Sequence, residues 1–527
     1  MTPDGFTDAW RKLGEGGWLS MSLPSEFGGQ GIPEVIAVIG KETQLAANQG
    51  FTIGASLTTG AANLIYTFGS DVQKNDFCQN MFSGKWAGTM CLTEPHAGSA
   101  VGDVITSATK HEEGHYLIKG TKQFITNGDH DMADNIVHLL LARTPNSQQG
   151  TKGISLFIVP KKRPDGTQND INLISIEHKM GINGSPTCVL SFGDNNDCHG
   201  YLLEAENMGM EQMFKLMNEA RLLVGLQGLA GASAAVQNAW AYANERTQGS
   251  SSINPEKKAS IIEFPDVRRM LMHMKAVTEG LRALMYTTAW YIDMSNHGPE
   301  ENREKYQDLL DLHIPICKAF GTDQGFEVAR IGIQILGGVG FTKHFPLEQN
   351  IRDQKIGSIY EGTNGIQALD LVGRKFTSKK GTLLKVLGKE LRWFDNRSLE
   401  GELSGWVAEW NNYRTLMIES IDCMSKIAET KGKDGYILYA ANMLDLMGDV
   451  LSCFYLLKQA EIAQKKWNGI NTHKVSEEEL LEDNQEAQFY WNKLRTVEYY
   501  VWSVLPRALS HAKTIKNANL SPLNARL

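Results

Sequence analysis

A block of short, strand-like runs lies between two stretches with helical periodicity, and this alternation limits the folds open to the chain. From Trp86 to about Gly193 the sequence contains runs such as WAGTMCLT, NIVHLLLAR, GISLFIVP and TCVLSFG, which are rich in β-branched and aromatic residues. Turn-forming pairs such as Asn127-Gly128 and Asn183-Gly184 separate them. Several such runs in succession, with no helical stretch between them, predict a compact, barrel-like β-domain.

Helical patterns fill the chain on both sides of this block. Residues 1–85 are expected to be helical, with a break at Gly28-Gly29 and with Pro33 in the first turn of the second helix. After Asn207, apolar residues recur at three- and four-residue steps, as in a helix bundle. The later helices predicted are 207–246, 265–294, 304–336 with an interruption at Pro315, 403–430, 435–466 and 486–515.

The length of 527 residues is too great for one ordinary core, so several domains are expected. The predicted fold class is α+β and multidomain: an N-terminal helical segment, a central β-barrel-like domain, a helical bundle and an additional C-terminal helical domain. The predicted domain ranges are 1–85, 86–200, 201–376 and 377–527.

Composition and charge exclude some classes of function. The chain is 42% hydrophobic and 21% charged, which is typical of a globular protein. Its net charge of −8 argues against a general nucleic-acid binder, which would carry a basic excess. No apolar run reaches the length of about 18 residues that a membrane-spanning helix needs, so we expect no membrane span.

The cysteines and the first residues bear on location. The seven cysteines are scattered, with no CxxC pair, which fits a reducing compartment better than a disulfide framework or a zinc site. The start, MTPDGFTDAW, lacks the pattern of a secretory signal. We therefore expect a protein without a metal site that is cytoplasmic, or from a matrix-like space if its true start lies upstream.

Two motifs in the β-block are candidates for ligand contact. CLTEPHAGS begins at Cys91, where a strand runs into a turn that contains Pro and Gly, and such a turn exposes backbone N–H groups and small hydroxyls. KQFITNG begins at Lys122 and ends in an Asn-Gly turn. Taken alone, the first is better interpreted as a capped β-turn and the second as an ordinary hairpin.

A third motif, IYEGTNG, contains Glu361 and follows QILGGVG, which begins at Gln334. A glutamate between Tyr360 and Gly362, just ahead of a helix start, has the setting of a positioned acid. It can equally be an acid that interacts with the helix dipole. The dipole favours the ionised form, and exclusion of water by an apolar ligand raises the pKa toward the range of an effective base.

In this order and at these separations, the three motifs resemble those of the acyl-CoA dehydrogenase family. The resemblance covers residues 1 to about 376 and is strongest in LTEP-x-AGS, FITNG, QILGG-x-G and IYEGTN. The remaining C-terminal helices, together with HDMADNIVHLLLAR and EGTNGIQALDLVGRK, resemble the subgroup that carries an extra C-terminal helical domain.

The resemblance implies an enzyme that contains FAD and oxidises an acyl-CoA to the trans-2-enoyl-CoA. Glu361 would take the α-proton, and flavin N5 would accept the β-hydride. Hydrogen bonds from the glutamate N–H and the flavin ribityl chain to the thioester carbonyl would stabilise the enolate. Electrons would pass to an electron-transfer flavoprotein, and the active form would be a homodimer or a dimer of dimers.

The resemblance also assigns contacts to individual residues, some of them to the FAD of a neighbouring subunit. The implied catalytic base is Glu361. The implied FAD contacts are Leu92, Thr93, Ser99, Phe124 and Thr126 near the ring and phosphates, Thr363 just after the base, and Arg246, Gln334, Gly337 and Gly338 toward the neighbouring subunit. The implied substrate contacts are Ser99, Arg221, Tyr360 and Gly362. Arg221 has a second interpretation of nearly equal weight, as a solvated residue on a helix face.

The sequence departs from the family pattern at several positions. Phe124 replaces a common Trp, the segment after Arg246 reads TQGSSS in place of a short Phe-Gly turn, and Gly365 replaces a common Gln. The family pattern also implies further helices ahead of Phe6.

Two other functions remain open on sequence alone. An acyl-CoA oxidase of the same fold would pass its electrons to oxygen. A flavin-binding scaffold without turnover is disfavoured because Glu361 is present in an intact YEGT context.

Overall fold

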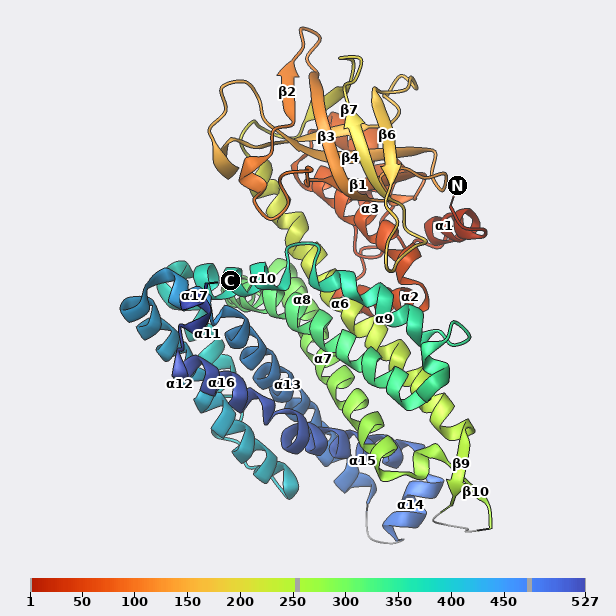
Figure 1. Ribbon diagram of the computed structural model, residues 1–527, viewed down its shortest axis with the longest axis vertical. Coiled ribbons are helices and arrows are strands. Elements are labelled where there is room, and N and C mark those ends of the chain that lie inside the picture. Colours follow the sequence, from red (N-terminus) through yellow and green to blue (C-terminus); the bar gives the residue numbers. More distant parts are fainter. Residues whose placement is uncertain (1, 252–255, 472–475, 527) are drawn as a thin grey trace. The chain divides into compact units, whose positions relative to one another are not determined.

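The computed structural model describes residues 2–251, 256–471 and 476–526. The chain divides into two compact units, Met1–Leu223 and Val224–Leu527 (Figure 1). Along the chain, helical segments precede and follow a central mixed sheet, which confirms the predicted α+β, multidomain class. The finer domain boundaries at 85, 200 and 376 stay a prediction.

The first unit contains an eight-stranded sheet within its described residues, in the order β1-β4-β5-β8-β3-β7-β6, with β2 paired to β3. The strands are β1 (Trp86–Cys91), β2 (Ser107–Lys110), β3 (Tyr116–Thr126), β4 (Asn135–Ala142), β5 (Ser155–Pro160), β6 (Ile171–Ile176), β7 (Thr187–Phe192) and β8 (His199–Leu202). β1 and β4 are parallel and the other pairs antiparallel. The sheet curls enough for the Gln123 N–H in β3 to donate to the Thr93 carbonyl just after β1, at 2.9 Å.

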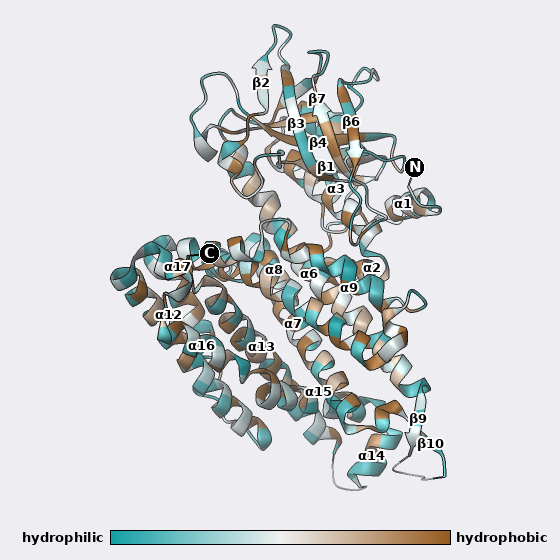
Figure 2. Ribbon diagram, viewed as in Figure 1, coloured by the Kyte–Doolittle hydropathy of each residue, from teal (hydrophilic) through white to brown (hydrophobic). Residues whose placement is uncertain are grey.

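β4 and β5 form the centre of this unit, and all of their residues are buried. On one face Leu139, Leu141 and Leu156 join a core with the helices of the unit. On the other face Leu140 and Phe157 pack with residues of β3 and β7. A strand buried on both faces reads as a continuous apolar run, which explains the sequence NIVHLLLA (Figure 2).

Helices cover the first of these two faces. Buried residues of α3 (Gln49–Phe68) and α5 (Gln79–Phe82) join the core on this face, and the other helices of this part of the chain are α1 (Phe6–Glu15), α2 (Glu34–Ala47) and α4 (Asp71–Gln73). The Thr58 hydroxyl of α3 accepts a hydrogen bond from the Gly88 N–H of β1 at 2.9 Å. A side chain at Gly88 would collide with Ala61 and Met81, so glycine permits this close packing. Pro33 directly precedes α2 and caps it, rather than lying in its first turn.

The second unit is a helix bundle in which α6 and α8 cross at very short range. Its first helices are the later part of α6 (Gly209–Glu245), α7 (Pro265–His297) and α8 (Glu300–Leu336), with a small hairpin of β9 (Thr247–Ser250) and β10 (Lys258–Ser260) after α6. A Cβ added to Gly228 of α6 would lie 2.3 Å from the Gly321 carbonyl oxygen of α8. The predicted interruption at Pro315 is wrong, because α8 continues through it. Its neighbours Ile314 and Ile316 are buried, and their packing offsets the cost of the proline.

The C-terminal helices pack around α13, whose central part is buried. The remaining helices are α9 (Leu347–Lys355), α10 (Asn364–Leu369), α11 (Thr382–Glu390), α12 (Glu402–Ile437), α13 (Ala440–Ile470), α14 (Glu477–Asp483), α15 (Gln485–Tyr499), α16 (Arg507–Asn517) and α17 (Ser521–Asn524). The single helix expected over 486–515 is in fact α15 and α16, which Pro506 separates because it has no N–H to donate. Among the described helices, α13 alone is long and apolar enough to cross a bilayer, and 83% of that window is buried inside the protein.

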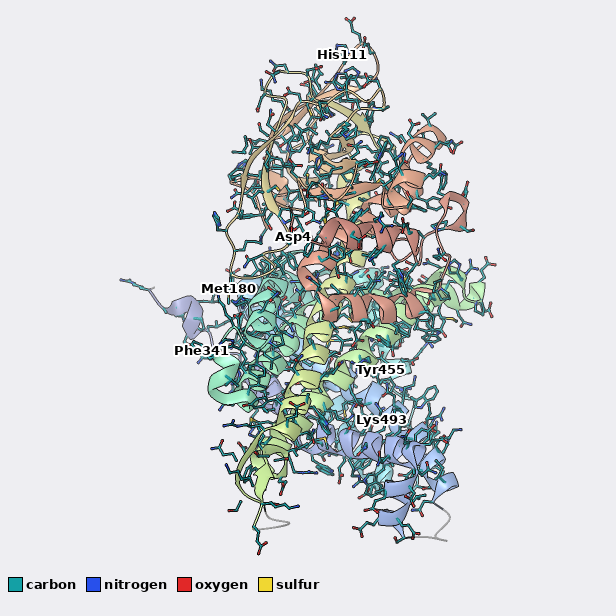
Figure 3. All side chains as sticks on the ribbon, turned by 90° about the vertical axis from the view of Figure 1, so that its right-hand side faces the viewer. Asp4, His111, Met180, Phe341, Tyr455 and Lys493 are labelled. Atoms are coloured by element: carbon teal, nitrogen blue, oxygen red, sulfur yellow. The ribbon has the colours of Figure 1, made fainter. Side chains whose placement is uncertain are left out.

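Tyr455 shows how α13 is held in the bundle (Figure 3). Its hydroxyl lies 2.7 Å from His313 Nε2 of α8 and 3.1 Å from the Tyr291 hydroxyl of α7. All three side chains are buried, so each polar atom satisfies another inside the bundle.

Candidate active site

In the first unit, a buried ion pair joins the LTEP motif to the FITNG motif. The Glu94 carboxylate accepts hydrogen bonds from Lys122 Nζ at 2.8 Å and from the backbone N–H groups of Ile105 and Thr106 at 2.8 and 3.0 Å. Lys122 also donates to the Leu92 carbonyl at 3.0 Å. Burial pushes the pKa of Glu94 up, but Lys122 and these hydrogen bonds outweigh burial and hold the pKa below its usual value. Glu94 is therefore an ionised structural link between the motifs.

A β-bulge places Phe124 at the surface of the sheet. The register between β3 and β7 shifts between Lys122 and Ile125, and Phe124 lies there with a φ of 59°. A left-handed conformation is unusual for an aromatic residue, and the bulge turns the Phe124 ring outward, 57% exposed. Thr126 ends the same strand. The hairpin interpretation of this motif is wrong, because β3 pairs with β2, β7 and β8 and not with β4.

The predicted FAD-ring residues of this unit thus come from two neighbouring segments. Leu92 and Thr93 are half-buried, and Ser99 is exposed after the turn in which Glu94 and Ala97 exchange backbone hydrogen bonds of 3.0 Å. An exposed aromatic ring and two half-buried threonines, on segments that the Glu94–Lys122 ion pair links, suit a planar ligand with a polar edge. These residues fit an isoalloxazine ring.

In the second unit, Glu361 lies in a loop with unusual backbone geometry. Its φ is 54°, and that of Gly362 is 78°. A left-handed conformation costs a glutamate about 1–2 kcal/mol, so the surrounding structure must hold it. Gln367 Nε2 donates to the Glu361 carbonyl at 3.2 Å and to the Gly362 carbonyl at 3.3 Å.

A lysine of α8 also holds the Glu361 loop, through hydrogen bonds. Lys318 is fully buried, and its Nζ donates to the Gly362 carbonyl at 2.7 Å and to Asn364 Oδ1 at 2.8 Å. Asn364 Nδ2 donates in turn to the Ala319 carbonyl at 3.2 Å. Thr363 caps α10, and its hydroxyl accepts from the Ile366 N–H at 3.2 Å. The loop is therefore attached to one turn of α8.

Tyr360 is fixed on the other side of Glu361. Its hydroxyl donates to Gln227 Oε1 of α6. Burial, and next the negative charge of Glu361, raise the pKa of Tyr360 well above its usual value. The phenol therefore stays protonated as a hydrogen-bond donor, close to the carboxylate.

The residues predicted to contact the neighbouring subunit lie at the far end of α8. Gln334, Gly337 and Gly338 are exposed, and Gly337 ends α8 with a φ of 65° and a ψ of −142°, a region open to glycine. Phe341, 87% exposed, follows them (Figure 3). Sixteen residues of α8 separate Lys318 from Gln334, about 24 Å along the helix.

Arg246 is exposed just after the end of α6. Tyr242, one turn earlier, packs edge-on against Phe345 with ring centroids 5.5 Å apart, so Arg246 lies at the same end of the unit as Gly337. The structure does not bring these residues together with Glu361 within one chain.

Arg221, in the first unit, is 3% exposed. The alternative interpretation of Arg221 as a solvated residue is therefore wrong. Its role toward CoA stays a prediction.

Sequence reasoning missed two side chains in each unit that hold the predicted site residues: Glu94 and Lys122 in the first, and Lys318 and Gln367 in the second. The first two stand inside the motifs, where a buried acid and a buried lysine invite pairing. Lys318 gave only a weak signal, a charged residue within the apolar stretch IPICKAF.

Domain models of one family match four successive parts of the chain. The N-terminal domain of acyl-CoA dehydrogenases matches residues 2–85, the middle domain 89–195 and the C-terminal domain 207–376. A domain described as acetyl-CoA dehydrogenase C-terminal like matches residues 398–525.

Individual relatives agree. The chain is 36% identical to 3-methylmercaptopropionyl-CoA dehydrogenase of Ruegeria pomeroyi over 100% of this chain and 88% of that protein. It is 36% identical to a butyryl-CoA dehydrogenase of Syntrophomonas wolfei over 99% of this chain and 86% of that protein. An acyl-CoA dehydrogenase of Bacillus anthracis, crystallised with FAD, has the same fold, with a TM-score of 0.76 and 24% identity over 97% of this chain and 82% of that one.

These matches confirm the predicted family and the predicted subgroup, the one that includes 3-methylmercaptopropionyl-CoA dehydrogenase. The chain belongs to the acyl-CoA dehydrogenases, a family of oxidoreductases that bind FAD.

Proposed function

We propose that this chain removes one hydrogen each from Cα and Cβ of an acyl-CoA and yields the trans-2-enoyl-CoA, with Glu361 as the base. One observation carries the proposal: Glu361 is a glutamate in the left-handed region whose loop is fixed by Lys318 and Gln367. Such strain is maintained where geometry serves function.

The chemistry of the carboxylate follows from its setting. Glu361 takes the α-proton, and the electron pair of the broken Cα–H bond forms the new π bond as hydride leaves Cβ. Bound FAD supplies the hydride acceptor. The protonated phenol of Tyr360, beside Glu361, keeps a second anion out of the site.

The acidity of the substrate must be raised as well. A thioester α-proton is far too weak an acid for a carboxylate in water. We propose that the Glu361 backbone N–H donates to the thioester carbonyl and stabilises the enolate, as hydrogen bonds do in oxyanion holes. Gly362 and Tyr360 would line the substrate next to it.

The proposed FAD contacts are Leu92, Thr93, Ser99, Phe124, Thr126 and Thr363, with Arg246, Gln334, Gly337 and Gly338 toward the FAD of a second copy. All four are exposed, and Gln334 lies about 24 Å along α8 from Lys318, which supports a homodimer or a dimer of dimers. A guanidinium at Arg246 suits a pyrophosphate because it donates in a planar fork. Ser99 and Arg221 are the proposed contacts to CoA.

Two further parts of the proposal concern electron transfer and location. The proposed electron acceptor is an electron-transfer flavoprotein, and rapid reoxidation of the reduced enzyme by air would instead identify an oxidase. The cysteines are free thiols, and all except Cys423 are buried, which fits a reducing compartment; we propose the cytoplasm.

The test is anaerobic bleaching of the flavin by acyl-CoAs, beginning with butyryl-CoA and 3-(methylthio)propionyl-CoA, the thioesters named by the relatives above. Glu361→Gln should keep the yellow colour and bind ligand, yet bleach about 10²–10⁴-fold more slowly, because it lacks the base. Glu327→Gln is the matched control, since Glu327 is paired with Arg330 on the exposed side of α8. Bleaching of Glu361→Gln at the wild-type rate would refute the proposal.

A further inference from the structure

The Glu361 loop is held by a buried cation that the proposed chemistry does not itself use. Lys318 lies in the middle of α8 and is 0% exposed. An ammonium in a protein interior is costly, and an apolar side chain of the same length would fill the same space without that cost. A buried lysine at this position therefore calls for a role beyond packing.

The hydrogen bonds of Lys318 indicate what that role is. Its Nζ donates to the carbonyl of Gly362, the residue directly after Glu361, and to Asn364 Oδ1. The peptide carbonyl of Gly362 points at Lys318 in a backbone that turns with positive φ at both Glu361 and Gly362. Lys318 thus favours the conformation that sets the direction of the Glu361 side chain.

A second layer keeps Lys318 and Asn364 in place. Asn364 Nδ2 lies 3.1 Å from Thr322 Oγ1, one turn after Lys318 on α8. Asp323 is also close, since burial raises the pKa of its carboxyl while its hydrogen bond with Asn364 and the charges of Lys355 and Lys318 lower it. Lys318, Thr322 and Asp323, all on this turn of α8, therefore interact with Asn364 in the segment that follows Glu361.

We propose that Lys318 is a positioning residue for the base: its buried ammonium holds the Gly362 carbonyl and so aims the Glu361 carboxylate at the substrate α-carbon. This inference rests on the proposed function. Positioning acts on the rate of proton removal and leaves ligand affinity nearly unchanged, which separates it from a purely structural role.

The experiment measures proton removal apart from flavin reduction. Methylthioacetyl-CoA carries α-hydrogens but has sulfur in place of Cβ, so it can lose an α-proton and cannot lose a β-hydride. In D₂O, mass spectrometry of this thioester follows α-hydrogen exchange, and its binding is measured by titration of the flavin spectrum. Lys318→Met removes the ammonium and keeps the length of the side chain.

Lys375→Met is the matched control, since Lys375 is also a buried lysine of the second unit, is paired with Asp311 at 3.3 Å, and follows α10 whereas the loop precedes that helix. We expect Lys318→Met to slow α-hydrogen exchange about 10²-fold, because small displacements of a catalytic group have effects of this size. The dissociation constant of methylthioacetyl-CoA should stay within about threefold of the wild-type value. Lys375→Met should exchange as wild type does, even if its melting temperature falls equally.

Exchange by Lys318→Met at the wild-type rate, or a loss no larger than that of Lys375→Met, would overturn the inference. If Lys318→Met fails to fold, Lys318→Gln, which keeps a neutral donor, decides on the same criteria. A wild-type protein that binds the thioester without exchanging it would refute the proposed function itself, and the role of Lys318 with it.

Discussion

Gly448 of α13 is one point at which the C-terminal helices meet α8, and Gly448→Ala tests that contact. A Cβ at Gly448 of α13 would lie 2.4 Å from Cγ and 2.5 Å from Cδ2 of Phe320. Phe320 stands two residues after Lys318, is 1% exposed and lies under the Arg507 guanidinium, 5.4 Å from its ring centroid.

Two opposing effects decide the sign of the change. Alanine is favoured over glycine in a helix by about 1 kcal/mol. Overpacking a filled core costs about 1–3 kcal/mol, and contacts well below 3 Å to the base of a ring place this site toward the upper end. We therefore expect Gly448→Ala to destabilise the second unit by about 1–2 kcal/mol, despite its better helix propensity.

Differential scanning calorimetry measures the change, with Gly405→Ala as the control. Gly405 is an exposed position of α12 where an added Cβ meets nothing within 4 Å, so this variant should be slightly more stable than wild type. Gly448→Ala should melt a few degrees lower. Phe320→Leu in the same chain should recover part of the loss, because the two side chains then no longer collide. Equal stabilisation by both glycine substitutions would refute the close contact of α13 with α8.

Other outcomes follow from the buried charges. Lys122→Met should destabilise the first unit by about 3–5 kcal/mol in calorimetry, because it leaves the buried Glu94 without its cation. The double variant with Glu94→Gln should recover part of this loss. An unchanged melting temperature for Lys122→Met would contradict the role of the ion pair. Burial, and then the charges of Asp449 and Asp323, raise the pKa of Asp445 to about 7 from an ordinary value of 3.8. The folded protein therefore holds an extra proton between these values, so the contribution of Asp445 to stability is complete below about pH 4 and is lost as the pH rises to about 7. Asp445→Asn should flatten that decline in melting temperature, and an unchanged slope would show that Asp445 titrates normally.

Local pattern was enough to predict much of the fold. Short runs rich in β-branched and aromatic residues, separated by turn-forming residues, predicted the β-block, and helical periodicity predicted α6, α7, α12 and α13, because both signals are local in the sequence. The same reasoning failed at Pro315, Pro506 and Asn127-Gly128. At Pro315, packing in the bundle outweighs the local preference of proline, and after Asn127 the chain crosses to a different part of the sheet.

The candidate site also has features that the sequence predicts and features that depend on the tertiary structure. The sequence by itself determined the motifs, and with them the family and Glu361 as the proposed base, because those residues are neighbours along the chain. Only the tertiary structure decided what holds them. Glu94 meets Lys122 across 28 positions, and Lys318 reaches Gly362 across 44. Such pairings depend on how helices and strands pack, and the energy that favours them exists only once water has been excluded from both partners.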